Sequence, residues 1–243
     1  MSDELPEELQ SEAQSDAGES AVESSALPET GSLAEAAALF GIDLDPATLA
    51  GVDRYVKLLW EWNEKINLTR HTDYSKFAAR DLLDCVQLAA LLHQGEEILD
   101  VGSGGGVPGV VLAILRPDLQ VSICDSVGKK ARVLQEMVKA LGLPVAVYDQ
   151  RAESLLEDFR YDAVTARAVG PMAKMLKWFQ PHWASIGRLL LIKGPKWLDE
   201  RGEARHYGLL NGLECRKAAE YAMPGSQSQS VIIKIWPKGA AEK

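Results

Sequence analysis

Residues 98–109 have the sequence Ile-Leu-Asp-Val-Gly-Ser-Gly-Gly-Gly-Val-Pro-Gly, and this stretch decides the fold. Its apolar start predicts a buried strand, and the apolar run at residues 110–115 predicts a buried helix. Between them, glycines tolerate a positive φ and lack a Cβ, so that a ligand can lie against the backbone. Unpaired N–H groups at the start of the helix would face that ligand. The stretch predicts a nucleotide-binding corner, with a plain tight turn as the alternative.

After this corner, predicted strands and helices alternate, which is typical of a parallel sheet with crossover helices. Strands are expected at 98–101, 120–125, 145–148, 161–165 and 188–192, and helices at 110–115, 129–141, 152–159, 171–179 and 197–210. Two further strands, at 213–223 and 230–236, predict an antiparallel hairpin. We therefore expect a class I, Rossmann-like α/β fold with a mostly parallel seven-stranded sheet, as in methyltransferases that use S-adenosylmethionine (AdoMet).

The chain before the sheet is predicted to be helical, with helices at 33–40, after Asp45–Pro46, and at 74–92. Residues 1–30 contain nine acidic residues and no Lys or Arg, and they have few large apolar side chains. Such a segment cannot offset its ordering entropy by burial. We therefore expect a disordered acidic tail (1–30), a helical extension packed on the core (31–94), an AdoMet-binding methyltransferase domain (95–238) and a flexible end (239–243).

The net charge of −9 comes from this tail, because the other 26 acidic residues are balanced by 26 Lys and Arg. A neutral remainder does not exclude a nucleic-acid substrate. Cys85, Cys124 and Cys215 are widely spaced and match neither a disulfide framework nor a metal site. The sequence shows no basic start followed by an apolar region, so we expect no Sec signal peptide, and it has no apolar run long enough for a membrane span. We expect a monomeric, cytoplasmic protein that uses neither a metal nor a membrane.

Two acids near the glycines favour AdoMet over a dinucleotide. Asp125 ends the second predicted strand, 23 residues after Gly102, where a carboxylate can bind ribose hydroxyls; a helix cap is the alternative. Asp100 occupies a place that is usually apolar in dinucleotide-binding chains. Its charge suits the ammonium of AdoMet, directly or through neighbouring backbone groups. We expect the cofactor to be held by Asp125 and by the turn from Gly102 through Gly104 to Val107.

The turn after the third predicted strand contains Ala152 and Glu153. In this fold that turn flanks the adenine, and backbone N–H groups there can bind its ring nitrogen. We expect both residues to contact the cofactor. For Glu153 the alternative is stabilisation of the first turn of the following helix.

The chemistry is expected after the fourth predicted strand, at Ala166-Arg167-Ala168. The Asp/Asn-Pro-Pro-aromatic motif of amino-group methyltransferases is absent there, and so is the Pro-Cys pair of cytosine C5 methyltransferases. Arginine is suited to stacking on a base or to bidentate pairing with a base edge. We expect Arg167 to be the catalytic residue, at the junction of cofactor and base, with a surface ion pair as the alternative.

Basic residues gather near the predicted carboxyl ends of the strands, where ligands bind in open α/β sheets. We expect four of them to contact RNA phosphate: Arg80, Lys129, Lys193 and Lys196. Arg188 is counted with the same basic surface. Taken singly, each of these residues could instead be a solvated surface cation.

From Leu33 to Pro237 the chain resembles the RsmG family, also called glucose-inhibited division protein B, of bacterial small-subunit rRNA guanine-N7 methyltransferases. The resemblance is carried by Trp62-Asn63, Asn67-Leu68-Thr69, Arg80 with Asp84, Asp100–Gly109, Asp125-Ser126, Gly128-Lys129, Arg151–Glu153, Ala166–Ala168 and Lys193-Gly194. It places Gly102, Val107, Ala152, Glu153 and Arg167 on the family's AdoMet-binding positions. The implied substrate is a guanine in the decoding-region loop of 16S rRNA, free or in a precursor of the small ribosomal subunit.

The chain departs from the family at two places. Asp81 stands where the family usually has histidine, so that any substrate contact of that histidine is lost or has moved, with His71 as the nearby candidate. The family's Gly-Pro-Gly is Gly104-Gly105-Gly106 here, which predicts a looser loop that still binds.

Three other functions remain open at this point. The chain could methylate another RNA, a protein or a small molecule. It could be a non-catalytic RNA-binding assembly factor on the same fold. It could also be a nicotinamide dehydrogenase, which Asp100 and the terminal hairpin disfavour.

Overall fold

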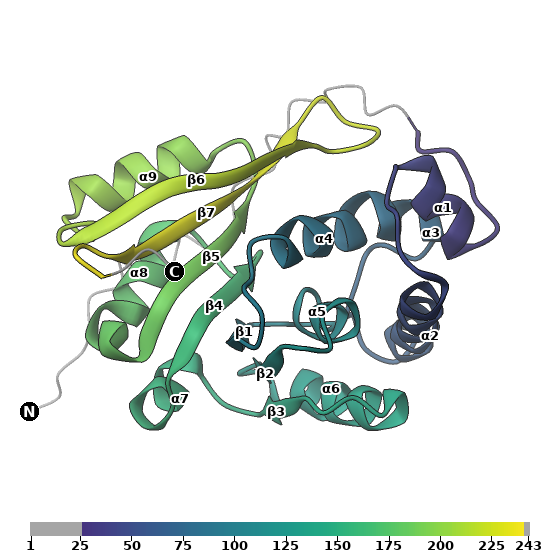
Figure 1. The fold of residues 1–243 in the computed structure, drawn as a ribbon, viewed down its shortest axis with the longest axis horizontal. Helices are drawn as coiled ribbons and strands as arrows, with labels where there is room; N and C mark the ends of the chain where they lie inside the picture. The colour runs from purple at the N-terminus through teal and green to yellow at the C-terminus, as the bar shows by residue number, and fades with distance from the viewer. Residues whose placement is uncertain (1–25, 241–243) are drawn as a thin grey trace, which may run out of the picture.

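Seven strands form one sheet in the order β3-β2-β1-β4-β5-β7-β6 (Figure 1). The structure is a computed structural model that describes residues 26–240, so most of the predicted tail and part of the predicted flexible end lie outside the described residues. The strands are β1 (Glu97–Val101), β2 (Gln120–Cys124), β3 (Ala146–Tyr148), β4 (Tyr161–Arg167), β5 (Ile186–Lys193), β6 (Leu213–Ala222) and β7 (Gln229–Pro237). The first five are parallel, and β7 runs antiparallel to both β5 and β6. This arrangement confirms the predicted fold.

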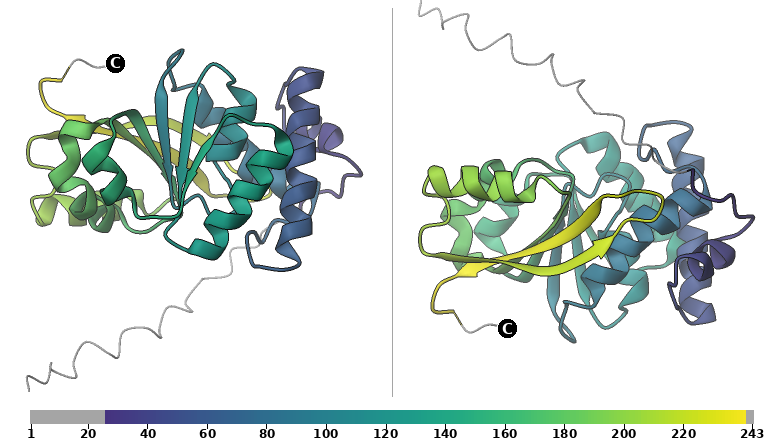
Figure 2. Two further views of the ribbon diagram at one scale, coloured as in Figure 1. Left: turned by 90° about the horizontal axis from the view of Figure 1, so that it is seen from below. Right: turned by 90° about the horizontal axis from the view of Figure 1, so that it is seen from above.

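Helices cover both faces of the sheet (Figure 2). The core on one face includes α4 (Leu83–Ala89), α5 (Gly109–Leu115) and α6 (Gly128–Leu141), and α2 (Pro46–Asn63) and α1 (Leu33–Leu39) pack outside these helices. The other face packs against α7 (Ala152–Asp158), α8 (Met172–Phe179) and α9 (Trp197–His206), and a 3-10 segment, η3 (Gln180–Ser185), follows α8. Successive side chains of a strand point to opposite faces, so Ile98 belongs to the first core and Leu99 to the second.

The third helix of the extension is interrupted. A single helix was predicted at 74–92, but the chain forms α3 (Tyr74–Lys76), a π-helical segment η2 (Phe77–Leu82) and then α4. Such π segments often occur at functional sites because they shift the direction of the side chains that follow. Here Asp81 lies in η2, and Asp84 lies in the first turn of α4.

Residues 26–30 lie against this helix. The hydroxyl of Thr30 is 3.0 Å from that of Ser75, and the Ser75 hydroxyl donates to the carbonyl of Pro28. Ser75 is buried as a result. Ordered packing therefore begins inside the stretch 1–30 that composition marks as a tail.

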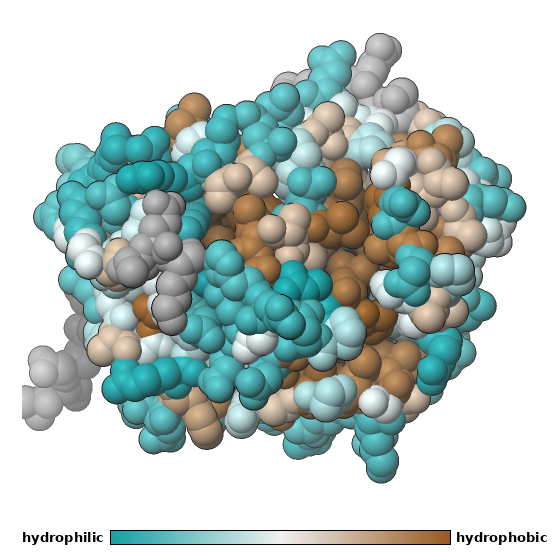
Figure 3. Space-filling model, viewed as in Figure 1, coloured by the Kyte–Doolittle hydropathy of each residue, from teal (hydrophilic) through white to brown (hydrophobic). Residues whose placement is uncertain are grey.

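The face formed by the hairpin and α4 has a divided surface (Figure 3). Hydrophilic side chains cover α9, whereas apolar side chains gather over α4, where Leu83 and Val86 are only partly buried. Among residues 26–240, no helix has the length and apolar character needed to cross a bilayer.

Arg188 does not belong to the basic surface with which it was grouped. It is the third residue of β5, near the amino end of the strand, and only 3% of it is exposed. Its two Nη atoms donate to the two carboxylate oxygens of Glu96 at 2.7 Å each, and Nη2 also donates to the carbonyl of Leu91. This buried pair joins β5 to the residue just before β1, so Arg188 stabilises the fold and contacts no phosphate.

Replacing Arg188 should destabilise the whole domain. Arg188→Met leaves the Glu96 carboxylate buried and unpaired, which costs about 3–5 kcal/mol of unfolding free energy. Urea unfolding followed by circular dichroism measures this loss. The double variant Glu96→Gln with Arg188→Met should recover much of it, because no lone charge remains. An unchanged midpoint in the single variant would contradict the assigned role of the pair.

Candidate functional site

The site lies where the order of the parallel strands reverses, between β1 and β4. In open α/β sheets, ligands bind beyond the carboxyl ends of the strands at this switch point. The loops that follow β1, β2, β3, β4 and β5 all end on this edge of the sheet. The predicted site residues of these loops are therefore gathered along one edge.

Asp100 holds the glycine turn from beneath. Its carboxylate accepts hydrogen bonds from the Gly109 N–H and from the Thr165 hydroxyl, each at 3.0 Å, and the residue is fully buried. It thus joins β1, the start of α5 and β4. Burial raises the pKa of Asp100 to about 6, although these hydrogen bonds favour the charged form. Asp100 was predicted to act on the ammonium of AdoMet either directly or through neighbouring backbone groups. Because its carboxylate is buried beneath the turn, the geometry favours the route through the backbone.

The glycine turn, for which three consecutive glycines predicted a looser loop, is closely packed on its outer side. A Cβ on Gly105 would lie 2.9 Å from Leu59 Cδ1 and 3.3 Å from the Leu68 carbonyl oxygen. The Tyr55 hydroxyl donates to the Gly105 carbonyl at 2.9 Å. The helical extension therefore packs against the turn from outside, and a side chain at 105 would require the end of Leu59 to shift.

Asp125 also braces the turn. Its two carboxylate oxygens accept from the N–H groups of Gly104 at 2.9 Å and Val127 at 2.8 Å. Gly104 has a φ of +59°, which aims its N–H at this carboxylate and which other residues rarely adopt. Each carboxylate oxygen has a second lone pair, so Asp125 can serve the turn and still accept from a ligand hydroxyl.

A first cavity of about 430 Å³ opens beside this turn, a volume within the usual range of ligand pockets. It is lined by Val101, Gly102, Cys124, Ser126, Gln150, Arg151, Ala152, Glu153, Val169, Lys174 and Trp178. A Cβ on Gly102 would come within 2.9 Å of Val169 Cγ2, so a glycine is needed where the backbone forms the cavity wall. The residues present thus fit a nucleoside whose ribose and base lie along the ends of β1, β2 and β3.

The predicted cofactor residues divide into two groups. Gly102, Ala152 and Glu153 line the first cavity, whereas Gly104, Val107 and Asp125 shape the turn behind it. Lys174 and Trp178 also line the cavity; the sequence indicated Lys174 only as one of the basic residues near the strand ends, and it did not single out Trp178. They lie one turn apart on α8, with the Lys174 ammonium over the Trp178 ring, a spacing that could have indicated a shared face.

A second cavity of about 500 Å³ lies across the 168–170 loop from the first. Its lining includes His71, Arg80, Asp84, Arg167, Ala168, Gly170, Ile192, Lys193, Gly194, Glu200, Met223 and Ser230. Arg167, the last residue of β4, lies on the wall of this cavity. The loop that separates the two cavities therefore begins directly at the predicted catalytic residue.

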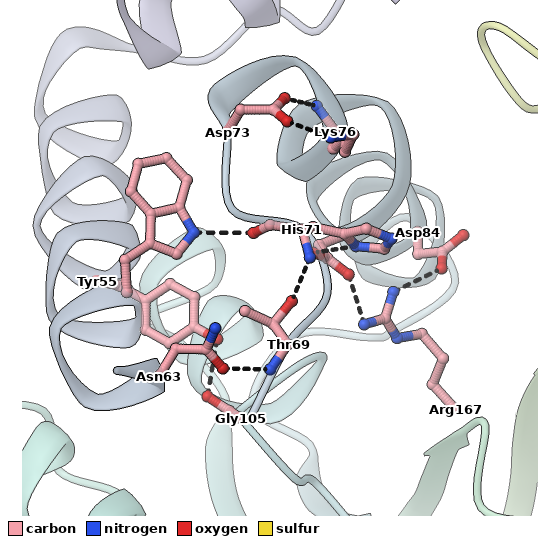
Figure 4. Close-up of polar contacts among 11 residues, drawn as sticks. Tyr55, Asn63, Thr69, His71, Asp73, Lys76, Asp84, Gly105 and Arg167 are labelled. Carbon is pink, nitrogen blue, oxygen red and sulfur yellow. Dashed lines mark hydrogen bonds and ion pairs between the residues drawn. The ribbon is translucent and has the colours of Figure 1, made fainter. Parts of the chain in front are cut away.

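Two buried carboxylates hold Arg167 (Figure 4). Its Nη2 lies 2.5 Å from Asp81 Oδ1, and its Nη1 donates to Asp84 Oδ2 at 3.1 Å. The Tyr221 hydroxyl of β6 donates to the other Asp84 oxygen at 2.7 Å. The side chains of Asp81 and Asp84 are 1% and 7% exposed, so these contacts are not the surface ion pair considered as the alternative. We call Asp81, Asp84, Arg167 and Tyr221 the arginine clamp.

The pKa values of Arg167 and Asp84 are both raised, but for different reasons. Burial opposes the charge on Arg167, but the carboxylates of Asp81 and Asp84 outweigh it and raise the pKa of the guanidinium. Burial raises the pKa of Asp84, while Arg167 and Tyr221 counteract the shift. Arg167 therefore stays charged, and its orientation is set by two fixed partners.

His71 extends the clamp into the loop after α2. Its Nδ1 is 2.8 Å from Asp81 Oδ2, and its side chain is partly exposed toward the second cavity. The Asn63 side-chain oxygen accepts from the N–H groups of Leu68 and Thr69 and fixes this loop, and the Thr69 hydroxyl then accepts from the His71 N–H (Figure 4). Asn63 of the Trp-Asn piece and Thr69 of the Asn-Leu-Thr piece thus serve to place His71.

The four predicted phosphate contacts lie in different settings. Arg80 and Lys193 line the second cavity, whereas Lys129 and Lys196 are exposed outside both cavities. The Lys193 ammonium is already engaged, because it lies 2.7 Å from Glu200 Oε2 and donates to the Gly170 carbonyl at 2.6 Å. Lys193 therefore fixes the loop between the cavities before any substrate arrives.

Comparison with known proteins identifies the family. Residues 48–223 match the GidB family, described as rRNA small subunit methyltransferase G. The ribosomal RNA small subunit methyltransferase G of Rhodopirellula baltica is 56% identical over 184 residues, which cover 76% of this chain and 80% of the relative. That of a Roseiflexus species is 36% identical over 219 residues, which cover 86% and 93% of the two chains.

Solved structures support the fold. A crystal structure of a mutant of MtNAS in complex with S-adenosylmethionine has a TM-score of 0.53 and 16% identity and covers 84% of each chain. The structure of M. capricolum TrmK with S-adenosyl-homocysteine has a TM-score of 0.50 and 14% identity and covers 64% of this chain and 68% of that one. At these identities the likeness concerns the fold alone. With the family match over residues 48–223, the chain belongs to the rRNA small subunit methyltransferase G family.

Proposed function

We propose that this protein transfers the methyl group of AdoMet to N7 of a guanine in the decoding-region loop of 16S rRNA. The observation that carries the proposal is Arg167, held by two carboxylates at the end of β4 and on the wall of a cavity next to the first one. In this proposal the first cavity binds AdoMet and the second receives the guanine. The helical extension (31–94) and the methyltransferase domain (95–238) each supply one wall of the second cavity.

The chemistry requires alignment more than proton transfer. Guanine N7 carries a lone pair and no proton, so no general base has to expose the nucleophile. Bound AdoMet supplies an activated methyl group. The chain must then hold N7 in line with that group, and such alignment can contribute several kcal/mol. Arg167 suits this role because a guanidinium fixed by two carboxylates can stack on a base or pair with its edge without first being ordered.

Basic residues lie at the second cavity and on the surface outside it, where RNA would bind. Arg80 at the second cavity and the exposed Lys129 and Lys196 can contact phosphates, and their contacts would make binding weaken steeply with salt. Lys193 would contact the RNA from the wall of the second cavity. We propose that the substrate is 16S rRNA or a precursor of the small subunit, that the enzyme acts as a monomer, and that it works in the cytoplasm, where ribosomal subunits are assembled.

The substrate can be identified directly. The purified chain, incubated with methyl-labelled AdoMet, should label free 16S rRNA or assembled small subunits at one guanine. Borohydride and aniline treatment, which cleaves RNA at 7-methylguanosine, should cut at the labelled position. Comparing the two substrates shows which assembly state is used. Absence of label in both would contradict the proposed function.

Arg167→Lys should separate transfer from cofactor binding. Lysine keeps the positive charge but cannot span Asp81 and Asp84, so the group is misplaced while the carboxylates keep a cation. We expect transfer to fall about a hundredfold, because small misplacements near the reacting atoms are costly. The Kd of AdoMet, measured by titration calorimetry, should change less than about threefold. Arg167→Ala is less informative because it leaves two carboxylates buried and unpaired. Equal losses of binding and transfer would place Arg167 on the cofactor instead.

AdoMet binding should weaken in mild acid. Asp100 has a pKa of about 6, and its ionised form favours a cationic ligand above the turn. At pH 5 only about a tenth of the molecules carry the charge, so the apparent Kd should rise about tenfold relative to pH 7.5.

Asp100→Asn is the control for this pH dependence. Its amide oxygen can accept from Gly109, and its NH₂ group can donate to the Thr165 hydroxyl, so the turn is retained without the charge. The variant should bind AdoMet weakly at both pH values. If the wild type and Asp100→Asn lost affinity in parallel, a group other than Asp100 would be responsible.

A further inference from the structure

The charged groups around the second cavity are balanced. With His71 counted as neutral, Arg80, Arg167 and Lys193 supply three positive charges, and Asp84, Glu200 and the more deeply buried Asp81 supply three negative charges. Glu200 is paired with Lys193 at 2.7 Å, so the clamp carboxylates are the ones that offset Arg167 and Arg80. One carboxylate would be enough to pair with one arginine. The second carboxylate is costly, because a buried charge is destabilising unless it is fully compensated.

The proposed reaction moves positive charge toward this cavity. The N7 lone pair of the guanine forms a bond to the methyl carbon, and the bond from that carbon to the sulfonium sulfur breaks with its electron pair left on sulfur. The sulfur becomes neutral and the guanine ring becomes cationic, and no proton is moved. A second cavity with an excess of positive charge would oppose this step, whereas a balanced cavity would not.

We propose that Asp84 is a positioning residue that also acts electrostatically, because it holds Arg167 and offsets the positive charge that the guanine ring gains. This inference rests on the proposed guanine-N7 activity. Asp84 is the clamp carboxylate that lines the cavity, whereas Asp81 lies behind Arg167 and is shared with His71. The Tyr221 hydroxyl and Arg167 fix the two oxygens of Asp84 from different strands, so the charge cannot swing away from the cavity.

Asp84→Asn tests the charge with little change in shape. Its amide oxygen can accept from Arg167, and its NH₂ group can donate to the Tyr221 oxygen, which is able to accept. We expect single-turnover transfer to fall about ten- to a hundredfold, as for the loss of one preorganised charge at a reacting centre. Tyr221→Phe releases one Asp84 oxygen but keeps its negative charge, so the loss of transfer should be smaller than in Asp84→Asn. Asp73→Asn is the matched control, since it removes one exposed carboxylate two positions from His71, outside the lining of the second cavity, and retains a good helix cap.

A binding measurement without cofactor distinguishes charge from structure. The probes are two copies of one 16S rRNA fragment, with guanosine or 7-methylguanosine at the position mapped with the wild type. Asp84→Asn should lose about tenfold more affinity for the methylated fragment than for the unmethylated one, because only the former carries the cationic ring. A purely structural role would weaken both equally.

The outcomes separate the two levels of the proposal. If the wild type places no methyl group on guanine N7, the proposed function fails. If the wild type does so but Asp84→Asn keeps the wild-type rate or the wild-type preference between the fragments, the role of Asp84 alone is refuted. Should Asp84→Asn fail to fold in urea titrations, Asp81→Asn removes one charge from the same clamp, and the same shift in fragment preference is expected.

Discussion

The ion pairs of Arg167 with Asp81 and Asp84 join parts of the chain that are otherwise separate. Arg167 ends the central strand β4, the two carboxylates belong to the helical extension, and Tyr221 reaches Asp84 from the terminal hairpin. Because these groups are largely buried, each of them needs another member of the clamp as its ion-pair or hydrogen-bond partner. The second cavity therefore takes its shape from electrostatic pairing, and the extension is part of the site.

The features predicted from the sequence are those with local signals. Strands and helices have their own periods, and the glycine turn, the Asp45–Pro46 helix start and the hairpin turn each need particular residues at adjacent positions. The edge on which the site lies follows from the parallel strands, whose carboxyl ends meet on one side of the sheet. Element ends differed by a few residues: β4 extends through Arg167, and α9 ends at His206 instead of residue 210.

The features that escaped prediction depend on distant partners. Arg188 lies 92 residues from Glu96, and Arg167 lies 83 residues from Asp84. No local pattern distinguishes such residues from solvated cations, so Arg188 was placed on the surface and the clamp was not foreseen. The close packing around Gly105 also depends on distant residues, because Leu59 and Leu68 of the extension lie against it. The substitution of Asp81 for the family's usual histidine was visible in the sequence, but its pairing with His71 and Arg167 was not.

The hydrogen bond from Tyr221 to Asp84 spans 137 positions of the chain. Contacts of such separation close late, because the loop entropy must be lost before they form. During synthesis the N-terminal part emerges and folds first, so the extension and the parallel strands can assemble while the hairpin is still within the ribosome. The pocket wall that Tyr221 braces is completed only when the hairpin has emerged, so the second cavity of the nascent enzyme stays unfinished until the last strands of the sheet are in place.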